Sequence, residues 1–152
     1  MNIVLFQPEI PTNTGNIGRT CVATGTKLHL IRPLGFFIDD KSLKRAGMDY
    51  WHDLNVRIYN DFDDFLAQNN NPKVYMVETG AKKLYTEVEY KPNDFIMFGK
   101  ETTGIPNEIL SKYKETVVKI PMLPGTRSLN LSNAAAIVLF EALRQTNFEE
   151  LR

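Results

Sequence analysis

The chain has 152 residues, of which 43% are hydrophobic and 24% are charged, a composition typical of one globular domain with a full core. Its 18 basic and 18 acidic side chains balance, so the net charge lacks the basic excess common in nucleic-acid-binding proteins. No apolar run reaches the ~18–20 residues that span a bilayer, and the N-terminus does not resemble a signal peptide. One cysteine, Cys21, excludes an internal disulfide, and we expect a cytoplasmic protein that does not enter membranes.

Short apolar runs alternate with helical patterns along the whole chain. This order predicts an α/β fold, with a mostly parallel sheet and helices on both of its faces, in a single domain. The predicted strands are 2–6, 27–32, 56–59, 73–78, 94–98 and 116–120. The predicted helices are 15–24, 40–46, one that opens at 61, 106–113 and 132–146, the first capped by Asn13 or Thr14 and the last by Ser132.

Ligands bind parallel sheets at the carboxyl ends of the strands, so the loops that follow strands are the candidate sites. The first such loop, residues 8–19, is stiffened by two prolines and closed by small polar residues. Arg19 lies one helical turn after Gly15, from where its guanidinium can reach back toward the helix N-terminus. That geometry suits a phosphate or another anion. The same spacing also fits a capped helix with an exposed arginine.

The loop after Phe98 reads F-G-K-E-T-T-G-I-P over residues 98–106. Gly99, directly after a strand, lets another group approach the backbone closely, and Gly104 closes the turn. The spacing is neither that of a P-loop nor that of the G-x-G-x-x-G dinucleotide fingerprint. The loop therefore predicts a close backbone contact but no nucleotide-phosphate motif.

The loop after Ile120 is the most informative segment, because it is longer than the two to six residues usual for a strand-to-helix connection. Over residues 121–136 it reads P-M-L-P-G-T-R-S-L-N-L-S-N-A-A-A. Ser128, Asn130, Ser132 and Asn133 supply hydroxyls and amides, and the alanines leave room for a ligand at the start of the last helix. A long, well-ordered connection without a ligand is the alternative.

Other kinds of catalytic site lack support in the sequence. His29, His52 and Cys21 are too few and too scattered for a zinc-type cluster, so we expect no metal. His29 reads as a strand residue, and Cys21 as a small core residue. A hydrolase triad is not indicated, since no G-x-S-x-G elbow occurs.

Taken in order, the three loops resemble the three motifs of the SPOUT superfamily of knotted methyltransferases. The motifs N-x-x-x-x-x-R, F-G-x-E-x-x-G and I-P-M…S-L-N-L-S-N-A stand here at 13–19, 98–104 and 120–134. The start of the chain, N-I-V-L-F-Q-P-E-I-P-T-N-T-G-N-I, and R-A-G-M-D-Y at 45–50 resemble the members that methylate tRNA. The resemblance covers essentially the whole chain, which would form a single SPOUT-type domain over 1–152 with no added RNA-binding domain.

This resemblance implies a C-terminal deep trefoil knot, a homodimer, and S-adenosyl-L-methionine as the cofactor. It implies methyl transfer to the ribose 2′-hydroxyl of the wobble pyrimidine of tRNA, cytidine or a modified uridine, with tRNA-Leu as the expected substrate. Two alternatives stay open. One is a ribosomal RNA 2′-O-methyltransferase of the same superfamily, and the other is a non-catalytic RNA-binding relative.

The resemblance also assigns residues by matched position. Cofactor contacts fall on Val77, Glu78, Gly99, Ile120, Ser128 and Leu129. Catalysis falls on Arg19, Ser128 and Asn130, with Asn13 and Glu101 in support. Because a guanidinium scarcely deprotonates, we expect Arg19 to hold the phosphate beside the target ribose and to stabilise negative charge, not to act as a base.

Overall fold

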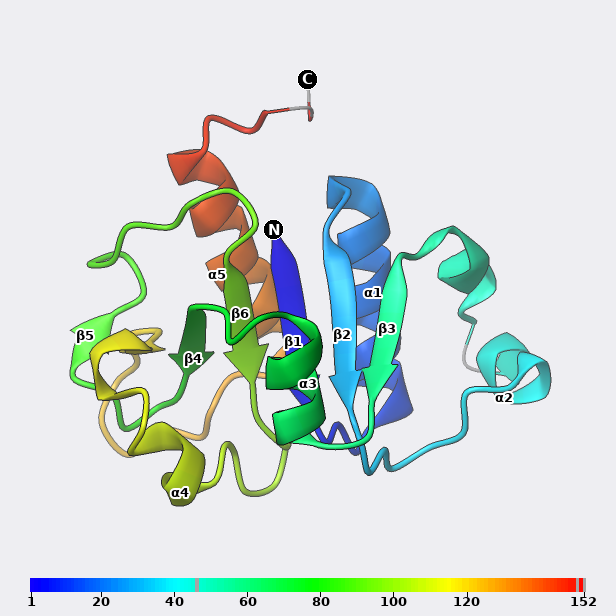
Figure 1. Ribbon diagram of the computed structural model, residues 1–152, viewed down its shortest axis with the longest axis horizontal. Helices are drawn as coiled ribbons and strands as arrows, with labels where there is room; N and C mark the ends of the chain where they lie inside the picture. The colour runs from blue at the N-terminus through cyan, green and yellow to red at the C-terminus, as the bar shows by residue number, and fades with distance from the viewer. Residues whose placement is uncertain (46, 150, 152) are drawn as a thin grey trace.

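A seven-stranded parallel sheet forms the centre of the protein, in a computed structural model that describes residues 1–45, 47–149 and 151 (Figure 1). The strands are β1 Asn2–Phe6, β2 Lys27–Ile31, β3 Val56–Tyr59, β4 Val74–Val77, β5 Lys83–Leu84, β6 Phe95–Phe98 and β7 Val117–Lys119. Their order in the sheet is β3-β2-β1-β6-β4-β7-β5, and every pairing between them is parallel. The predicted α/β class and parallel sheet are confirmed.

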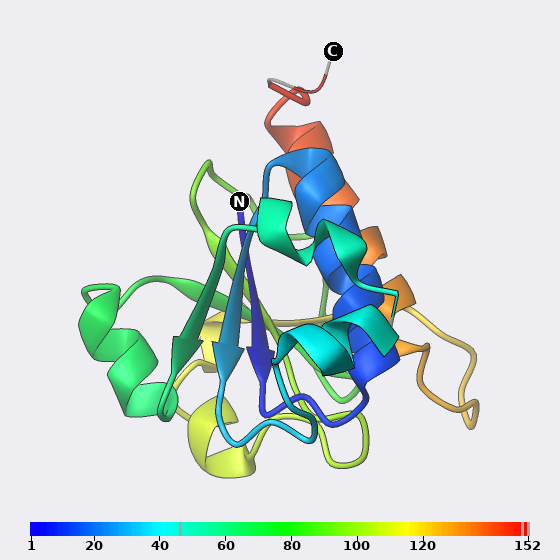
Figure 2. The same ribbon diagram turned by 90° about the vertical axis from the view of Figure 1, so that its right-hand side faces the viewer.

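Helices lie on both faces of this sheet, as predicted (Figures 1 and 2). They are α1 Pro11–Thr24, α2 Asp40–Arg45, α3 Phe62–Gln68, α4 Asn107–Leu110 and α5 Leu131–Gln145, with 3-10 turns η1 Asp49–Asp53 and η2 Lys114–Thr116. Helices α1 and α5 run side by side on one face, and α3 covers the other. None of the helices in the described ranges is long and apolar enough to cross a membrane.

The alternation of side chains along β1 divides the core into two clusters. Ile3 and Leu5 pack in the cluster that contains α1 and α5, whereas Val4 and Phe6 pack in the cluster around Phe65 of α3. A strand sends successive side chains to opposite faces, so a fully apolar strand needs cover on both sides. This is why the continuous run N-I-V-L-F forms a central strand between two helical layers.

Two predicted helix starts were wrong. Helix α1 starts at Pro11, not near Gly15, with Ile10 at its N-cap, because proline fits the first turn, where its missing N–H costs nothing. Asn13 and Thr14 are therefore buried inside the first turn and cap nothing. Helix α5 is capped by Asn130, two residues before the predicted Ser132.

The other errors concern short elements. The predicted helix to Tyr113 ends at Leu110, and turns lead from there to β7. The strand β5 and the turn η1 have too few residues to give a periodic pattern, and they were missed. The predicted helix over 40–46 is found over Asp40–Arg45, and its last predicted residue lies outside the described residues.

Candidate active site

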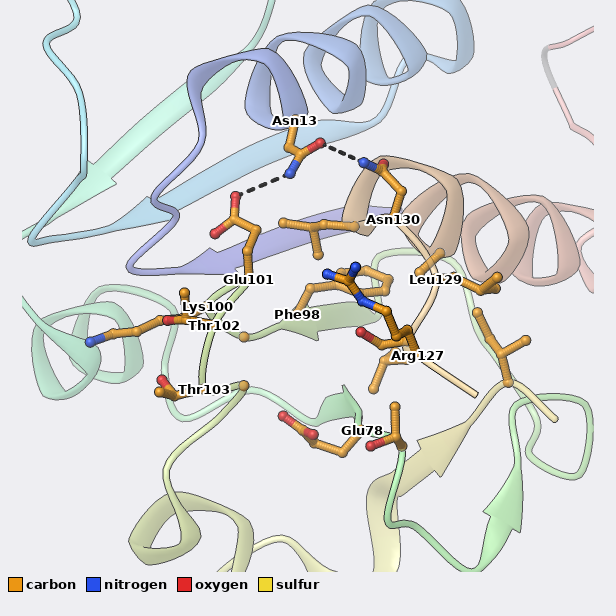
Figure 3. Close-up of a pocket in the computed structure, with 18 of the residues that line it drawn as sticks. Asn13, Glu78, Phe98, Lys100, Glu101, Thr102, Thr103, Arg127, Leu129 and Asn130 are labelled. Atoms are coloured by element: carbon orange, nitrogen blue, oxygen red, sulfur yellow. Dashed lines mark hydrogen bonds between the residues drawn. The ribbon is translucent and has the colours of Figure 1, made fainter. Parts of the chain in front are cut away.

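A cavity of about 600 Å³ opens where β4, β6 and β7 end, within the ~300–1,000 Å³ typical of small-molecule sites (Figure 3). Loops far apart in the sequence form its wall. The residues predicted to contact the cofactor all line it: Val77, Glu78, Gly99, Ile120, Ser128 and Leu129. So do Asn13, Glu101 and Asn130. The structure thus brings together every predicted site residue except Arg19.

The loop after β6 is closed by its own backbone. Lys100 N donates to Gly104 O at 3.2 Å, and Gly104 N donates to Lys100 O at 2.9 Å. A Cβ added to Gly99 would overlap the backbone of Gly104 and Ile105. The close approach predicted at Gly99 is therefore an approach of the chain to itself, which fixes the shape of the cavity wall.

Glu78 holds the far end of this loop. Its Oε1 accepts a hydrogen bond from Ile105 N, and a Cβ on Gly104, whose φ is +69°, would overlap the same carboxylate. Burial raises the pKa of Glu78, and hydrogen bonds from the backbone of Ile105 and Thr79 oppose that rise. A half-buried carboxylate at the cavity wall favours a cationic ligand.

A chain of hydrogen bonds joins the three motif loops (Figure 3). The Glu101 carboxylate accepts from Glu9 N at 2.9 Å, Ile10 N at 3.0 Å and Asn13 Nδ2 at 3.4 Å. Asn13 Oδ1 in turn accepts from Asn130 Nδ2 at 3.0 Å. A charged acceptor also stabilises the free N–H groups before a helix. Glu101 therefore ties the start of α1 to the β6 loop, and Asn13 extends the tie to α5.

Asn130 completes this arrangement at the start of α5. Its Oδ1 accepts from Ser132 N at 2.9 Å and Ser132 Oγ at 2.6 Å, as an N-cap residue does. Both ends of the Asn130 amide are thus occupied by protein groups, and its position at the cavity edge is fixed. The sequence indicated Ser132 as the cap because serine is a common cap; the pairing of Asn130 with Asn13 across the fold has no local signal.

Arg19 and Arg127 are placed differently. Arg19 is exposed on α1 and does not line the cavity of its own chain. Arg127, in contrast, lines the cavity (Figure 3). The ion pairs among the described residues join Lys83 to Glu115 and Arg144 to Glu141, so neither arginine is neutralised by one of them. Sequence reasoning missed Arg127, although a cation directly before Ser128 was a usable signal.

Metal-binding residues do not gather anywhere in the described part of the chain, where no three His, Cys, Asp or Glu side chains are placed to share an ion. His29 is buried in β2 and Cys21 is buried in α1. Both are core residues, as their sequence context predicted.

The SpoU rRNA methylase family matches residues 1–140, which includes all three motif loops. The chain belongs to this family. Among curated relatives, the tRNA (cytidine(34)-2′-O)-methyltransferase of Saccharophagus degradans is 49% identical and covers 97% of this chain and 96% of its own. The enzyme of the same name from Escherichia coli is 45% identical, with 97% and 95% covered.

Solved structures give the same assignment for this SpoU-family chain. A structure described as giving insights into 2′-OH methylation of C/U34 on tRNA superposes with a TM-score of 0.89 at 40% identity, covering 96% of this chain and 95% of that one. An AdoMet-bound rRNA methyltransferase from Sinorhizobium meliloti gives a TM-score of 0.79 at 26% identity, covering 94% of this chain and 55% of that one. The predicted resemblance to SPOUT methyltransferases, and within them to the tRNA group called TrmL, is confirmed.

Proposed function

We propose that this SpoU-family protein transfers a methyl group from S-adenosylmethionine to the ribose 2′-hydroxyl of the wobble pyrimidine, nucleotide 34, of tRNA. The observation that carries the proposal is the cavity at the strand ends, where all three motif loops meet. Its support is the 45–49% identity to tRNA (cytidine(34)-2′-O)-methyltransferases. The expected substrate is tRNA-Leu, with cytidine or a modified uridine at the target position.

The cavity suits the cofactor in size and in chemistry. Val77, Ile120 and Leu129 offer apolar contacts to a flat ring, and exposed backbone groups of the loops can read its polar edge. Glu78 contributes a carboxylate to the cavity wall, which would favour the positive charge of a bound sulfonium. The cofactor supplies a methyl group that is already activated by this positive charge, so the reaction needs no metal.

The protein's own residues would then align the ribose and stabilise charge. Ser128 and Asn130, at the cavity edge, are proposed to orient the 2′-hydroxyl, while Asn13 and Glu101 hold Asn130 in place. Alignment of this kind lowers a barrier by several kcal/mol, up to about 7–11 in favourable cases. Arg19, exposed and outside the cavity lining, is proposed to hold the RNA phosphate next to the target and to stabilise the developing alkoxide.

Further proposals concern the fold and assembly. We propose that the segment between β7 and α5 passes through a loop of the chain and forms a deep trefoil knot. Its support is that β7 lies between β4 and β5 toward one edge of the sheet, whereas α5 returns to pack on α1. We also propose a homodimer that works on tRNA in the cytoplasm.

Reconstitution of the reaction tests this function. Purified protein is incubated with cofactor and RNA from cells that lack the activity, and ribose-methylated nucleosides are mapped by mass spectrometry. We expect one 2′-O-methyl group, at nucleotide 34 of tRNA-Leu. Methylation of ribosomal RNA alone would support the rRNA alternative, and cofactor and RNA binding without methylation would support a non-catalytic relative.

A further inference from the structure

We propose that a second, smaller cavity binds an unpaired nucleobase of the RNA, next to the nucleotide that is methylated. This proposal rests on the proposed function and names a contact of the same substrate outside the cofactor cavity. The cavity measures about 360 Å³ and lies between the start of α1, the β2–α2 loop and α2. Phe36, Phe37, Leu43 and Met48 give it apolar walls, and Arg45 and Ser42 add polar groups.

The two cavities share one wall, the start of α1. Ile10 and Asn13 line the cofactor cavity, while Pro11 and Thr12, between them in the chain, line the second. These four consecutive positions, 10–13, fall within about one helical turn, so the two lining surfaces meet at the start of α1. A nucleotide placed at the cofactor cavity therefore has its neighbours in the strand within reach of the second cavity.

The aromatic segment that forms the second cavity is held in place by the active-site network. Gly35 N, one residue before Phe36, donates to Pro8 O at 2.9 Å. A Cβ on Gly35 would lie 2.7 Å from Glu9 Cα, so the two loops touch backbone to backbone. Glu9 N is itself bound by Glu101 at 2.9 Å. The distance between the two cavities is thus fixed by direct contacts.

Phe37 provides an exposed aromatic ring at this cavity. Its side chain is 81% exposed, the largest exposed fraction among the large hydrophobic residues of the described chain. Aromatic rings that stand free beside basic groups are the usual platforms on which unpaired bases stack. Every base has a π-face, so such a platform accepts a loop nucleotide without reading its sequence.

The charges around this cavity favour RNA as the occupant. Arg45 lines it, and Lys41 and Lys44 are exposed on the same short helix, α2. None of these three cations takes part in the two ion pairs found among the described residues. The neighbouring Asp39 carboxylate accepts from Ser42 N at 2.7 Å within the first turn of the helix. Exposed cations beside an aromatic ring match the phosphates and bases of a single strand.

The test uses an anticodon stem-loop RNA that carries 2-aminopurine at either nucleotide flanking position 34, because stacking quenches its fluorescence. With the wild type and saturating cofactor, we expect quenching at one of the two positions. Phe37→Ala should abolish the quenching and weaken RNA binding roughly tenfold, within the range of one lost base–aromatic stack. Phe37→Trp should restore both, and Phe37→Leu should not, since leucine keeps apolar area but has no ring.

Arg45→Ala should weaken RNA binding and reduce its salt dependence. Lys27 is an exposed lysine at the opposite end of β2, and Lys27→Ala should change neither quantity.

Two results would overturn this inference. One is that Phe37→Ala binds RNA and quenches the fluorescence as the wild type does. The other is that Phe37→Ala without RNA sediments differently from the wild type, which would make this surface a protein interface. Thermal melting checks that the variants fold, and titration of the cofactor should give unchanged affinity. Failure of the wild type to methylate tRNA would refute the proposed function. If the wild type methylates tRNA and Phe37→Ala leaves RNA affinity and quenching unchanged, only the present proposal is refuted.

Discussion

The fold places two candidate RNA-binding arginines, Arg19 and Arg127, differently relative to the cavity. Arg127 lines the cofactor cavity in the loop between β7 and α5, whereas Arg19 is exposed on α1 outside the cavity. The sequence motif singled out Arg19 alone. Because Arg19 is exposed and lies outside the cavity lining, its position supports a contact to RNA and not a contact to the cofactor.

Substitution of Arg19 separates catalysis from cofactor binding. Arg19→Ala should abolish methyl transfer and leave cofactor affinity within about twofold, because surface substitutions usually change binding or stability by less than ~0.5 kcal/mol. Arg19→Lys should recover little, since a point charge cannot reproduce a bidentate phosphate contact. Single-turnover methylation at saturating cofactor measures this, with the exposed Arg57→Ala as the control. Near-normal turnover in Arg19→Ala would show that the catalytic contact is elsewhere.

His29 is a residue whose role is purely structural. Asn2 Nδ2 donates to Asn93 O, so Asn2 Oδ1 is left to accept from His29 Nε2–H at 3.0 Å. His29 Nδ1 then accepts from the Tyr59 hydroxyl at 2.8 Å. Burial, with the nearby cations Arg57 and Lys27, lowers its pKa from 6.5 to about 4. The fold thus contains this imidazole in its neutral form.

A lowered histidine pKa predicts a specific loss of stability in acid. As pH falls, the unfolded chain takes up the proton before the folded one, so the contribution of His29 is complete above pH 6.5 and is lost toward pH 4. Between pH 7 and pH 5 this amounts to about 2 kcal/mol, at ~1.4 kcal/mol per pKa unit. Urea unfolding at both pH values should show this loss in the wild type and in the exposed His52→Gln, and a loss about 2 kcal/mol smaller in His29→Gln. Equal losses in all three would contradict the assignment.

At the scale of elements, the loops that follow β1, β6 and β7 are joined into one unit by hydrogen bonds among the side chains of Glu101, Asn13 and Asn130. Their content of glycine, proline and small polar residues indicated a site at the strand ends. The hydrogen bonds between them join residues as much as 117 positions apart, and no local pattern encodes such a pairing. The local patterns therefore located the site, and the family resemblance named Asn13 and Glu101 as supporting residues, but the hydrogen bonds that join them to Asn130 could not be predicted from the sequence.

Removal of the Glu101 charge tests this connection. A glutamine keeps one oxygen, so Glu101→Gln loses either the Glu9 N–H bond or the Ile10 N–H bond. We expect a loss of about 1.5–3 kcal/mol in unfolding free energy, the usual contribution of a hydrogen bond to a charged group, and slower methyl transfer. Chemical denaturation and single-turnover rates measure both. Glu108→Gln, an exposed glutamate on α4, is the matched control, and equal behaviour of the two variants would refute the role given to Glu101.

Sequence patterns were sufficient to predict most strands of the sheet and the helices that cover it. The apolar runs of β1, β2 and β3 and the alternation of strands with helices predicted the sheet and its cover correctly. Gly15 and Gly18 were harder to interpret: a Cβ on Gly15 would lie 2.8 Å from the Met48 side chain, and one on Gly18 would lie 3.2 Å from Leu54. These glycines let η1 pack against α1. A contact that depends on a missing side chain becomes visible only when both partners have been placed.

At the scale of the whole molecule, α5 leaves part of its apolar surface uncovered. Ala135, Val138, Leu139 and Ala142 are buried against the core, but Ile137 is 37% and Phe140 is 46% exposed. Apolar side chains three positions apart lie on one side of a helix. A second copy of the chain is the proposed cover for this side of α5.

Sedimentation tests the proposed dimer. The wild type should sediment as a dimer at micromolar concentration, and Phe140→Glu should dissociate it, because a buried charge without a partner is costly. Phe140→Leu, which keeps the apolar contact, should remain dimeric. A wild type that is monomeric at micromolar concentration would refute the proposal.

If the chain methylates one ribose hydroxyl of one tRNA nucleotide, the loss of that single oxygen from the substrate should prevent the reaction. Two tRNA-Leu molecules are compared, one with cytidine and one with 2′-deoxycytidine at position 34, using cofactor labelled in its methyl group. We expect one labelled methyl group per molecule on the first tRNA. We expect none on the second tRNA, which should still bind within a few-fold of the same affinity. Label transferred to the deoxy substrate at a normal rate would place the methyl group on a base or on another nucleotide, and would contradict the account.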